Sequence, residues 1–334
     1  MSERDAIAWN EVEVADLAAK VDALKNSMAR VIIGQQDVVE LLVTCLLAGG
    51  HALVEGVPGL GKTLLVKSLA QATDMQFRRV QFTPDLMPSD IVGTEILEED
   101  TTTRQRVFRF QQGPVFTQVL LADEINRAPP KTQSALLEAM QERAVTFAGT
   151  THQLPRPFFV LATQNPIEQA GTYPLPEAQL DRFLLRIDVG YPSEDEEVAM
   201  VSATTRAGLL DAQPAMDVAS LLRLQQLVRD IEVNERLVRY ATRLVRATRP
   251  AETTVAAVKS HVGWGAGPRA GQALVLASKA RALMHGRLAV TREDIGAMLM
   301  PVLAHRVLRN FEAEADGVAI AGILQALRSE IKVD

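Results

Sequence analysis

The residues best suited to chemistry form one glycine-rich segment: Gly56, Val57, Pro58, Gly59, Leu60, Gly61, Lys62 and Thr63. The segment matches the pattern G-x-x-x-x-G-K-[ST], in which backbone N–H groups and the N-terminus of the following helix surround phosphate oxygens. Lys62 would place its charge at the β- and γ-phosphates, and the Thr63 hydroxyl would bind Mg²⁺. An accidental glycine-rich turn is the alternative. The apolar run 51–55 before the segment and the helical pattern after it favour a phosphate-binding loop.

Two adjacent carboxylates follow another apolar run, Val119 to Ala122. Such a run predicts a buried strand, and ligands of open α/β sheets bind at the carboxyl ends of the strands. Asp123 is therefore expected in the Mg²⁺ shell. Glu124 is expected to orient and polarise the water that attacks the γ-phosphate.

Three further residues have a chemical and a structural interpretation. Asn165 follows the apolar run 158–162 and could hydrogen-bond a γ-phosphate and the attacking water, although Asn before Pro is also a common turn. Arg182 could stabilise transition-state charge from an exposed edge, or could pair with Asp181. Arg269 stands at the predicted start of a helix, where the helix dipole disfavours a cation and a nearby anion would explain it.

The elements around these residues alternate between short apolar strands and helices. The predicted strands are 51–55, 77–82, 119–123, 158–162 and 184–189, and predicted helices include 11–30, 38–47, 62–72 and 131–142. Continuous apolar strands that alternate with helices predict a parallel sheet covered on both faces. Two segments interrupt the pattern, 95–113 and 144–157, and each predicts an inserted β-hairpin, the second turning at Gly149.

The second half of the chain has a helical pattern almost throughout. Ser193 and Glu196 have the spacing of a capping box, which marks the start of a new helix. We therefore expect an α/β domain over 1–192, including the N-terminal helices, and an all-α domain over 193–334.

Composition limits the class of protein further. The chain has 334 residues, with 35 basic and 41 acidic side chains and a formal net charge of −6. The acidic balance disfavours a nucleic-acid coat protein. A single cysteine excludes a disulfide framework, and no apolar stretch is long enough for a membrane span. The N-terminus is too polar for a signal peptide, so we expect a cytoplasmic protein.

These motifs together resemble the MoxR family of AAA+ ATPases. The resemblance covers most of residues 31–310, and its most specific segments are DEINRAPPKTQ and LPEAQLDRF, with GVPGLGKT, ATQNP and GAGPRAGQALVLASKARAL beside them. It implies an α/β domain with a parallel P-loop sheet, helix-2 and pre-sensor-1 hairpin inserts, and an all-α lid. The two interruptions in the pattern stand where these inserts would be.

The resemblance also implies roles for individual residues. Asp123 and Glu124 correspond to the Walker B pair and Asn165 to sensor 1. Arg182 corresponds to the arginine finger that reaches a neighbouring subunit, with Arg186 a weaker second candidate. The family further implies that Arg269 is sensor 2, acting from the lid on its own subunit's γ-phosphate, and that Gly34 belongs to the nucleotide-binding region.

An arginine that acts on a neighbour implies a ring, and related rings are usually hexamers. The resemblance implies a chaperone-like, Mg²⁺-dependent ATPase that remodels or matures a client, or inserts a metal into it, with a partner that bears a von Willebrand factor A domain. A nucleic-acid motor is the alternative, disfavoured by the acidic charge and by the lack of a basic, aromatic-bearing module. A nucleotide-gated scaffold without turnover is a third possibility, which the intact set of polar residues disfavours.

Overall fold

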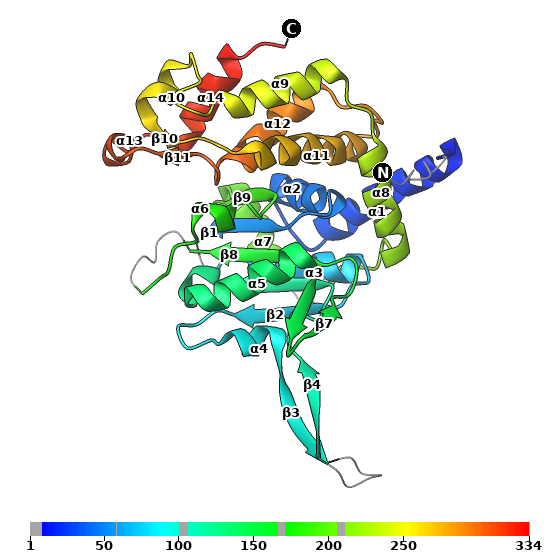
Figure 1. The fold of residues 1–334 in the computed structure, drawn as a ribbon. Helices are drawn as coiled ribbons and strands as arrows, with labels where there is room; N and C mark the ends of the chain where they lie inside the picture. The colour runs from blue at the N-terminus through cyan, green and yellow to red at the C-terminus, as the bar shows by residue number, and fades with distance from the viewer. Residues whose placement is uncertain (1–8, 58, 100–105, 166–170, 206–210, 334) are drawn as a thin grey trace, which may run out of the picture.

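The computed structural model describes residues 9–57, 59–99, 106–165, 171–205 and 211–333, so Pro58 of the glycine-rich segment lies outside the described residues. Layers of helix and sheet form the middle of the molecule, with a helical layer above them and a hairpin arm below (Figure 1). This arrangement confirms the predicted order, in which an α/β region precedes a helical one.

The central sheet contains five parallel strands, as the apolar runs predict. Their bounds are β1 Ala52–Gly56, β2 Phe77–Gln81, β5 Val119–Asp123, β8 Phe159–Gln164 and β9 Leu185–Val189. Their order across the sheet is β2-β5-β8-β1-β9. Because every strand runs in the same direction, all five carboxyl ends lie at one edge, where α/β proteins bind ligands. We call this the carboxyl edge and the opposite one the amino edge.

Two hydrophobic cores cover the two faces of this sheet. Alternate strand residues, such as Val54 and Leu121, pack with α1 (Glu11–Ala29), α2 (Gln36–Leu47) and α3 (Lys62–Ala72). Their neighbours, such as Leu53 and Leu120, pack with α4 (Pro88–Val92) and α5 (Pro130–Glu142). Burial on both faces explains why these strands are apolar throughout and do not alternate with polar residues.

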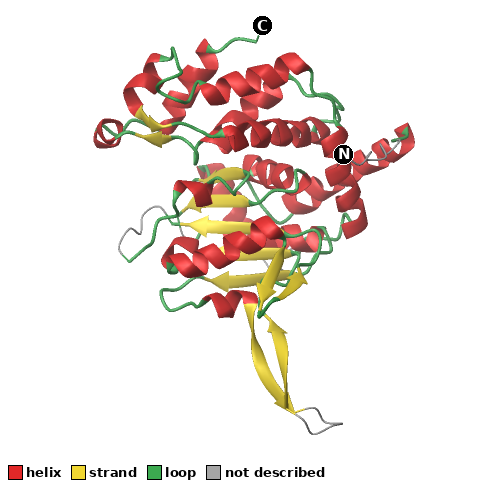
Figure 2. Cartoon of the chain, viewed as in Figure 1, coloured by secondary structure: helices red, strands yellow, loops and turns green. Residues whose placement is uncertain are grey.

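Both predicted hairpins are present. The first pairs β3 (Gly93–Glu99) with β4 (Arg106–Gln112) and forms the projecting arm in Figure 2; the second pairs β6 (Ala144–Phe147) with β7 (Thr150–Gln153). Phe110 of the arm stacks on His152 of the second hairpin, with ring centroids 4.3 Å apart. This contact joins the two insertions at the base of the arm.

After β9, the elements formed by the described residues are helices, apart from one small sheet. Its helices are α7 Glu194–Thr204, α8 Val218–Asp230, α9 Glu235–Arg246, α10 Ala256–His261, α11 Pro268–Met284, α12 Arg292–Leu303, α13 Phe311–Ala315 and α14 Ile320–Glu330. The expectation of an all-α region is wrong in one place, because β10 (Val262–Trp264) pairs antiparallel with β11 (Leu308–Arg309). Strands of two or three residues have no detectable periodicity, and only the fold brings these two together.

The core that contains α2 continues without interruption into α8, α11 and α12. The lid helices therefore pack directly on the α/β layers, and a boundary at residues 192 and 193 stays a prediction. In the described ranges, no helix has the length and apolar character needed to cross a bilayer.

Asp294 at the start of α12 ties α11 in place. Its side chain is fully buried and forms 2.6 Å ion pairs with Arg281 of α11 and with Arg287. Burial alone would raise the pKa of Asp294, but hydrogen bonds from Arg287, Thr291 and Arg281 hold that pKa well below its usual range.

Replacing this buried carboxylate is expected to destabilise the fold. Asp294→Ala leaves two arginines without their partner and should lower the free energy of unfolding by about 3–5 kcal/mol, measured by urea denaturation at pH 7. Because the folded pKa lies below the unfolded value of ~3.9, the stabilisation is present above that pH and is lost as the pH falls further. The gap between wild type and variant should therefore narrow below about pH 4. A gap that stays constant with falling pH would contradict this account.

Candidate functional site

The glycine-rich segment forms a loop between β1 and α3. Gly59 and Gly61 have φ angles of +87° and +75°, in the left-handed region that glycine adopts without strain. Gly61 is also the N-cap of α3, and no side chain caps that helix. Its first backbone N–H groups are therefore available for an anion, as the motif predicts.

Gly56 and Lys62 close this loop. A Cβ atom at Gly56 would lie 2.6 Å from the Val189 carbonyl oxygen, so glycine at this position is required by close packing on β9. Lys62 donates a hydrogen bond from Nζ to the Gly56 carbonyl oxygen at 2.5 Å. Burial lowers the pKa of Lys62, and the charges of Asp123 and Glu124 partly oppose that shift. The ammonium thus lies between the loop and the two carboxylates.

Asp123 ends β5 at the carboxyl edge of the sheet. Its Oδ1 accepts a 2.6 Å hydrogen bond from the Thr163 hydroxyl on β8. Its Oδ2 accepts a 2.7 Å charged hydrogen bond from Arg79 on β2. Neighbours on both sides therefore orient this carboxylate.

Glu124 adopts an uncommon backbone conformation immediately after the strand. Its φ of +56° is left-handed, which costs a residue with a side chain about 1–2 kcal/mol. Its N–H donates to the Thr163 hydroxyl at 2.8 Å, and its Oε2 accepts 2.6 Å from Gln81 Nε2 and lies 3.2 Å from Arg127 Nε. These contacts stabilise the turn and direct the carboxylate along the carboxyl edge.

Thr163 is a site residue that the sequence reasoning missed. The signal was the hydroxyl two positions before Asn165, directly after the predicted strand 158–162. The Thr163 side chain is buried and joins the Glu124 amide to the Asp123 carboxylate.

Thr163→Val keeps the shape of this side chain but removes both hydrogen bonds. Leaving the Glu124 amide unpaired is expected to lower the free energy of unfolding by about 1–3 kcal/mol and to reduce ATP turnover. Thr163→Ser keeps the hydroxyl and is the matched control, expected to stay near wild type. Urea denaturation and a steady-state ATPase assay would measure both effects; equal behaviour of Val and Ser would count against the hydroxyl's role.

Asn165 completes the group at this edge. It follows β8, which lies between β5 and β1 in the sheet, and it is 7% exposed. The fold therefore brings Asn165 between the loop that carries Lys62 and the strand that carries Asp123 and Glu124. The sequence expectation that these four residues converge agrees with this placement.

The remaining nucleotide-site candidates border the same edge. Thr63 is exposed in the first turn of α3. A cavity of about 290 Å³ lies beside Gly56, Val57 and Tyr191. Gly34 has a φ of +71°, and a Cβ there would lie 2.8 Å from the Glu196 side chain, so this turn packs on the start of α7. Leu60 packs against the core below the loop.

Magnesium fits the donors at this site. Thr63 supplies an exposed hydroxyl and Asp123 a carboxylate, both hard oxygen ligands of the kind that Mg²⁺ prefers. Asp123 Oδ1 accepts one hydrogen bond, from Thr163, and retains a further lone pair for a metal, whereas Oδ2 accepts two hydrogen bonds from Arg79. When bound with ATP, Mg²⁺ would neutralise charge on the phosphate oxygens.

Arg182 and Arg269 lie elsewhere, beside a separate cavity of about 200 Å³ that His51 and Met140 also line. His51 precedes β1, whereas the phosphate loop follows β1, so about 17 Å of strand separates the two places. Arg269 is 58% exposed and lies 3.9 Å from Asp181. The Arg182 Nε is buried and has no hydrogen-bond partner among the described residues.

This placement differs from the expectation for Arg269 and leaves the one for Arg186 a prediction. Arg269 does not approach the phosphate loop of its own chain, because the lid carries it to the amino edge beside Arg182. Arg186, the second finger candidate, lies on β9 and forms ion pairs with Glu55 at 3.0 Å and Asp188 at 2.8 Å. Burial raises the pKa of Glu55 despite the nearby Arg186 charge. Arg186 therefore has partners within its own chain.

A phosphate loop, a strand-end carboxylate pair and a helical lid define the class of P-loop ATPases known as AAA+. The family described as "ATPase family associated with various cellular activities (AAA)" matches residues 51–185, and the AAA lid domain matches residues 255–326. These matches agree with the fold and with the residues at the carboxyl edge.

Individual relatives identify the family within the AAA+ class. Chaperone MoxR1 of Mycobacterium tuberculosis is 45% identical over 91% of this chain and 80% of its own length. Protein MoxR of Paracoccus denitrificans is 32% identical over 88% of this chain and 90% of its own. The crystal structure of a candidate ATPase from Cytophaga hutchinsonii superposes with a TM-score of 0.90 at 39% identity, covering 97% of this chain and 98% of that one. The chain belongs to the MoxR family of AAA+ ATPases.

Proposed function

We propose that this protein hydrolyses ATP with Mg²⁺ at a site completed by a neighbouring copy of the chain. The phosphate loop and Lys62 bind the triphosphate, and Thr63 and Asp123 hold the metal. Glu124 accepts a proton from the attacking water, which Asn165 helps to orient. The arrangement of these residues at one edge of the sheet supports this assignment.

The observation that carries the proposal is the separation between this site and the two arginines. Arg182 and Arg269 share a cavity at the amino edge, about 17 Å of strand away from the phosphate loop. Within one chain they cannot contact the γ-phosphate. A head-to-tail interface brings the amino edge of one copy to the nucleotide of the next, and repeated contacts of this type close into a ring.

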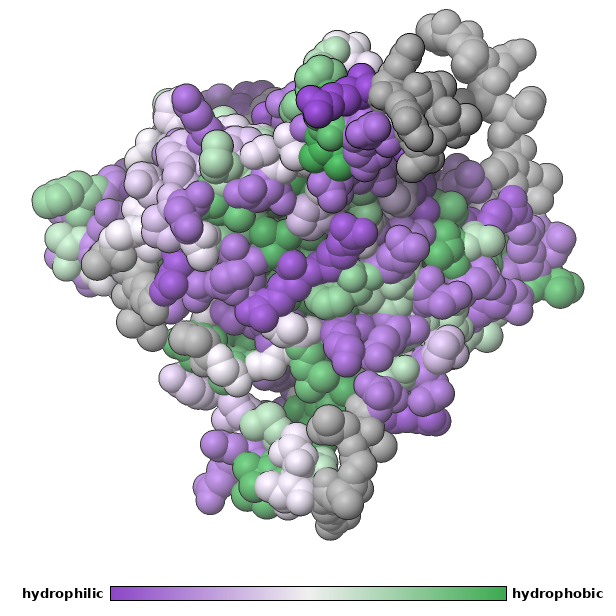
Figure 3. Space-filling view, turned by 90° about the horizontal axis from the view of Figure 1, so that it is seen from below, coloured by the Kyte–Doolittle hydropathy of each residue, from purple (hydrophilic) through white to green (hydrophobic). Residues whose placement is uncertain are grey.

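We infer that this ring is a hexamer and that it acts on a client protein in the cytoplasm. The relative named Chaperone MoxR1 supports a chaperone role. The hairpin arm supports client contact, because Leu97 and Phe108 face each other across it and are 51% and 70% exposed. Apolar patches lie between polar ones on the face from which the arm projects (Figure 3), and such patches mark interaction sites. Remodelling, maturation or metal insertion, with a von Willebrand factor A domain partner, is the family role we propose.

Mixing two inactive variants tests the shared site. Glu124→Gln removes the site's base but keeps the arginines, whereas Arg182→Ala keeps the site but removes the finger. In a 1:1 mixture, half of the protomers have a usable site and half of their neighbours have a usable arginine, so about a quarter of wild-type activity should return. Each variant alone should be nearly inactive. A mixture as inactive as its components, under conditions where rings form, would refute completion by a neighbour.

A further inference from the structure

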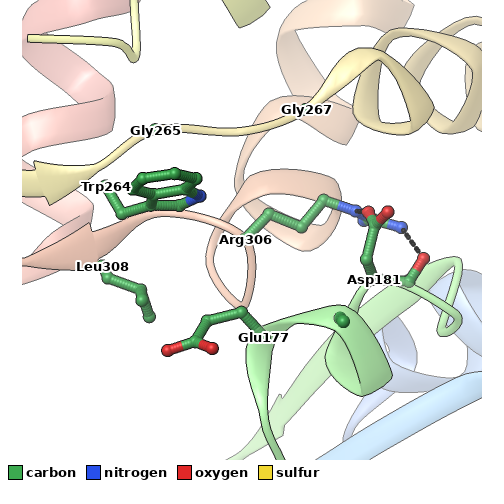
Figure 4. Close-up of a pocket in the computed structure, with 8 residues that line it drawn as sticks. Glu177, Asp181, Trp264, Gly265, Gly267, Arg306 and Leu308 are labelled. Atoms are coloured by element: carbon green, nitrogen blue, oxygen red, sulfur yellow. Dashed lines mark hydrogen bonds and ion pairs between the residues drawn. The ribbon is translucent and has the colours of Figure 1, made fainter.

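Arg306 anchors the lid on the chain segment that carries the finger. It follows α12 and its side chain is only 4% exposed. Nε donates to Asp181 Oδ1 at 2.8 Å, and the two terminal nitrogens donate to the carbonyl oxygens of Phe183 at 2.6 Å and Leu184 at 3.1 Å. Figure 4 shows Arg306 reaching from the lid to Asp181 beside a cavity of about 520 Å³.

These contacts lie on both sides of Arg182. Arg306 also donates to the Asp181 carbonyl oxygen at 3.3 Å, and the neighbouring His305 is hydrogen-bonded through Nε2 to the Phe183 carbonyl oxygen at 3.1 Å. The backbone of Asp181, Phe183 and Leu184 is thus attached to the lid. Arg182 Nε has no hydrogen-bond partner among the described residues. The position of the Arg182 backbone, which is attached to the lid on both sides, therefore determines where its guanidinium can reach.

Arg269 is connected to the same anchor. Asp181 presents Oδ1 to Arg306 and Oδ2 to Arg269, the latter at 3.9 Å. Asp181 therefore links the lid arginine at the start of α11 to the segment that carries Arg182. Arg306 holds this carboxylate from the buried side.

We propose that Arg306 is a positioning residue for both arginines that act on the neighbouring site, a role that rests on the proposed function above. Arg306 does not contact the nucleotide; it holds Arg182 and Arg269 at a constant separation, so that the lid and the finger segment approach the neighbour as one body. A planar guanidinium with five donors suits this task, whereas a lysine ammonium cannot reach all of these oxygens at once.

The mixed ring separates this role from a purely structural one. Arg306→Lys is introduced either into the Glu124→Gln chain, which donates arginines, or into the Arg182→Ala chain, which donates sites. In the arginine donor it should lower the activity of the mixture by about tenfold, because displacing a catalytic group by roughly 1 Å has effects of that size or larger. In the site donor it should change activity by less than about twofold, because the arginine edge of that chain is already inactive.

A matched control is Arg281→Lys, which alters one ion pair of the buried Asp294 in the lid without contacting residues 181–184. It should have the same small effect in either chain. Should Arg306→Lys fail to fold, Asp181→Asn provides a second variant that weakens the same anchor, and the same asymmetry is expected.

Three results would contradict either this proposal or the shared site on which it rests. Equal losses in both chains would show that Arg306 only supports the fold and would overturn the proposal, and so would no loss in either chain. If the parental mixture without Arg306→Lys recovers no activity, the shared site itself fails, which is a separate outcome.

Discussion

Arg182→Ala is expected to reduce steady-state ATP hydrolysis by roughly 10³-fold or more, while ATP binding by the isolated chain stays unchanged. The loss is large because a finger arginine stabilises charge that develops only in the transition state. Binding is spared because Arg182 lies at the amino edge, distant from its own phosphate loop. Hydrolysis would be measured by phosphate release at saturating ATP, and binding by titration with a fluorescent ATP analogue below the concentration at which copies associate.

Arg239→Ala is a suitable control for this variant. Arg239 is exposed on α9 and pairs at 2.5 Å with Glu235 one turn away, and such surface pairs contribute little. Its removal should leave hydrolysis near wild type. Unchanged turnover in Arg182→Ala would exclude Arg182 as the finger, and equal losses in turnover and in monomer binding would place it in the chain's own site.

Glu124→Gln is expected to reduce turnover by roughly 10²–10⁴-fold and to leave ATP bound. The amide keeps the size of the side chain and can still contact Gln81, so the turn after β5 should retain its geometry. It cannot accept the proton of the attacking water. The variant should therefore stabilise the ATP-bound assembly, which sedimentation and the nucleotide content of purified rings would measure.

Glu142→Gln is the control for Glu124→Gln, since Glu142 ends α5 and is exposed. This neutralises the same type of side chain without touching the carboxyl edge. Release of ATP from Glu124→Gln at the wild-type rate, or normal hydrolysis by it, would remove Glu124 from the role of base.

Both predictions depend on the positions of Glu124 and Arg182 at opposite edges of the central sheet. A parallel sheet puts the ends of β1, β5 and β8 side by side, so one chain can assemble the loop, the carboxylates and Asn165. The same parallel direction puts the segment before β9 at the opposite edge. In the proposed function, the single chain thus presents half of a site at each edge, and association of copies joins the halves.

Most of the fold could be predicted from local patterns. The strands, the two hairpins and α3, which begins at Lys62 as predicted, follow from apolar runs and turn residues, and the capping box at Ser193 predicts the start of α7. The small sheet of β10 and β11 could not, because its strands are shorter than any period. α11 begins at Pro268, so Arg269 lies in its first turn as expected, and proline suits this position because its missing N–H group is not needed there.

The candidate site divides in the same way. The amino-acid sequence alone determined which residues could bind phosphate and magnesium, because that chemistry depends on residue types at short, regular spacing, as at Lys62, Thr63, Asp123 and Glu124. The tertiary structure alone decided that Arg269 lies with Arg182, that Thr163 hydrogen-bonds the Asp123 carboxylate and that Arg306 contacts the segment that carries Arg182. The partners in these last contacts are 40 to 125 positions apart in the chain, and at such separations no spacing rule applies; proximity depends on how helices and strands pack.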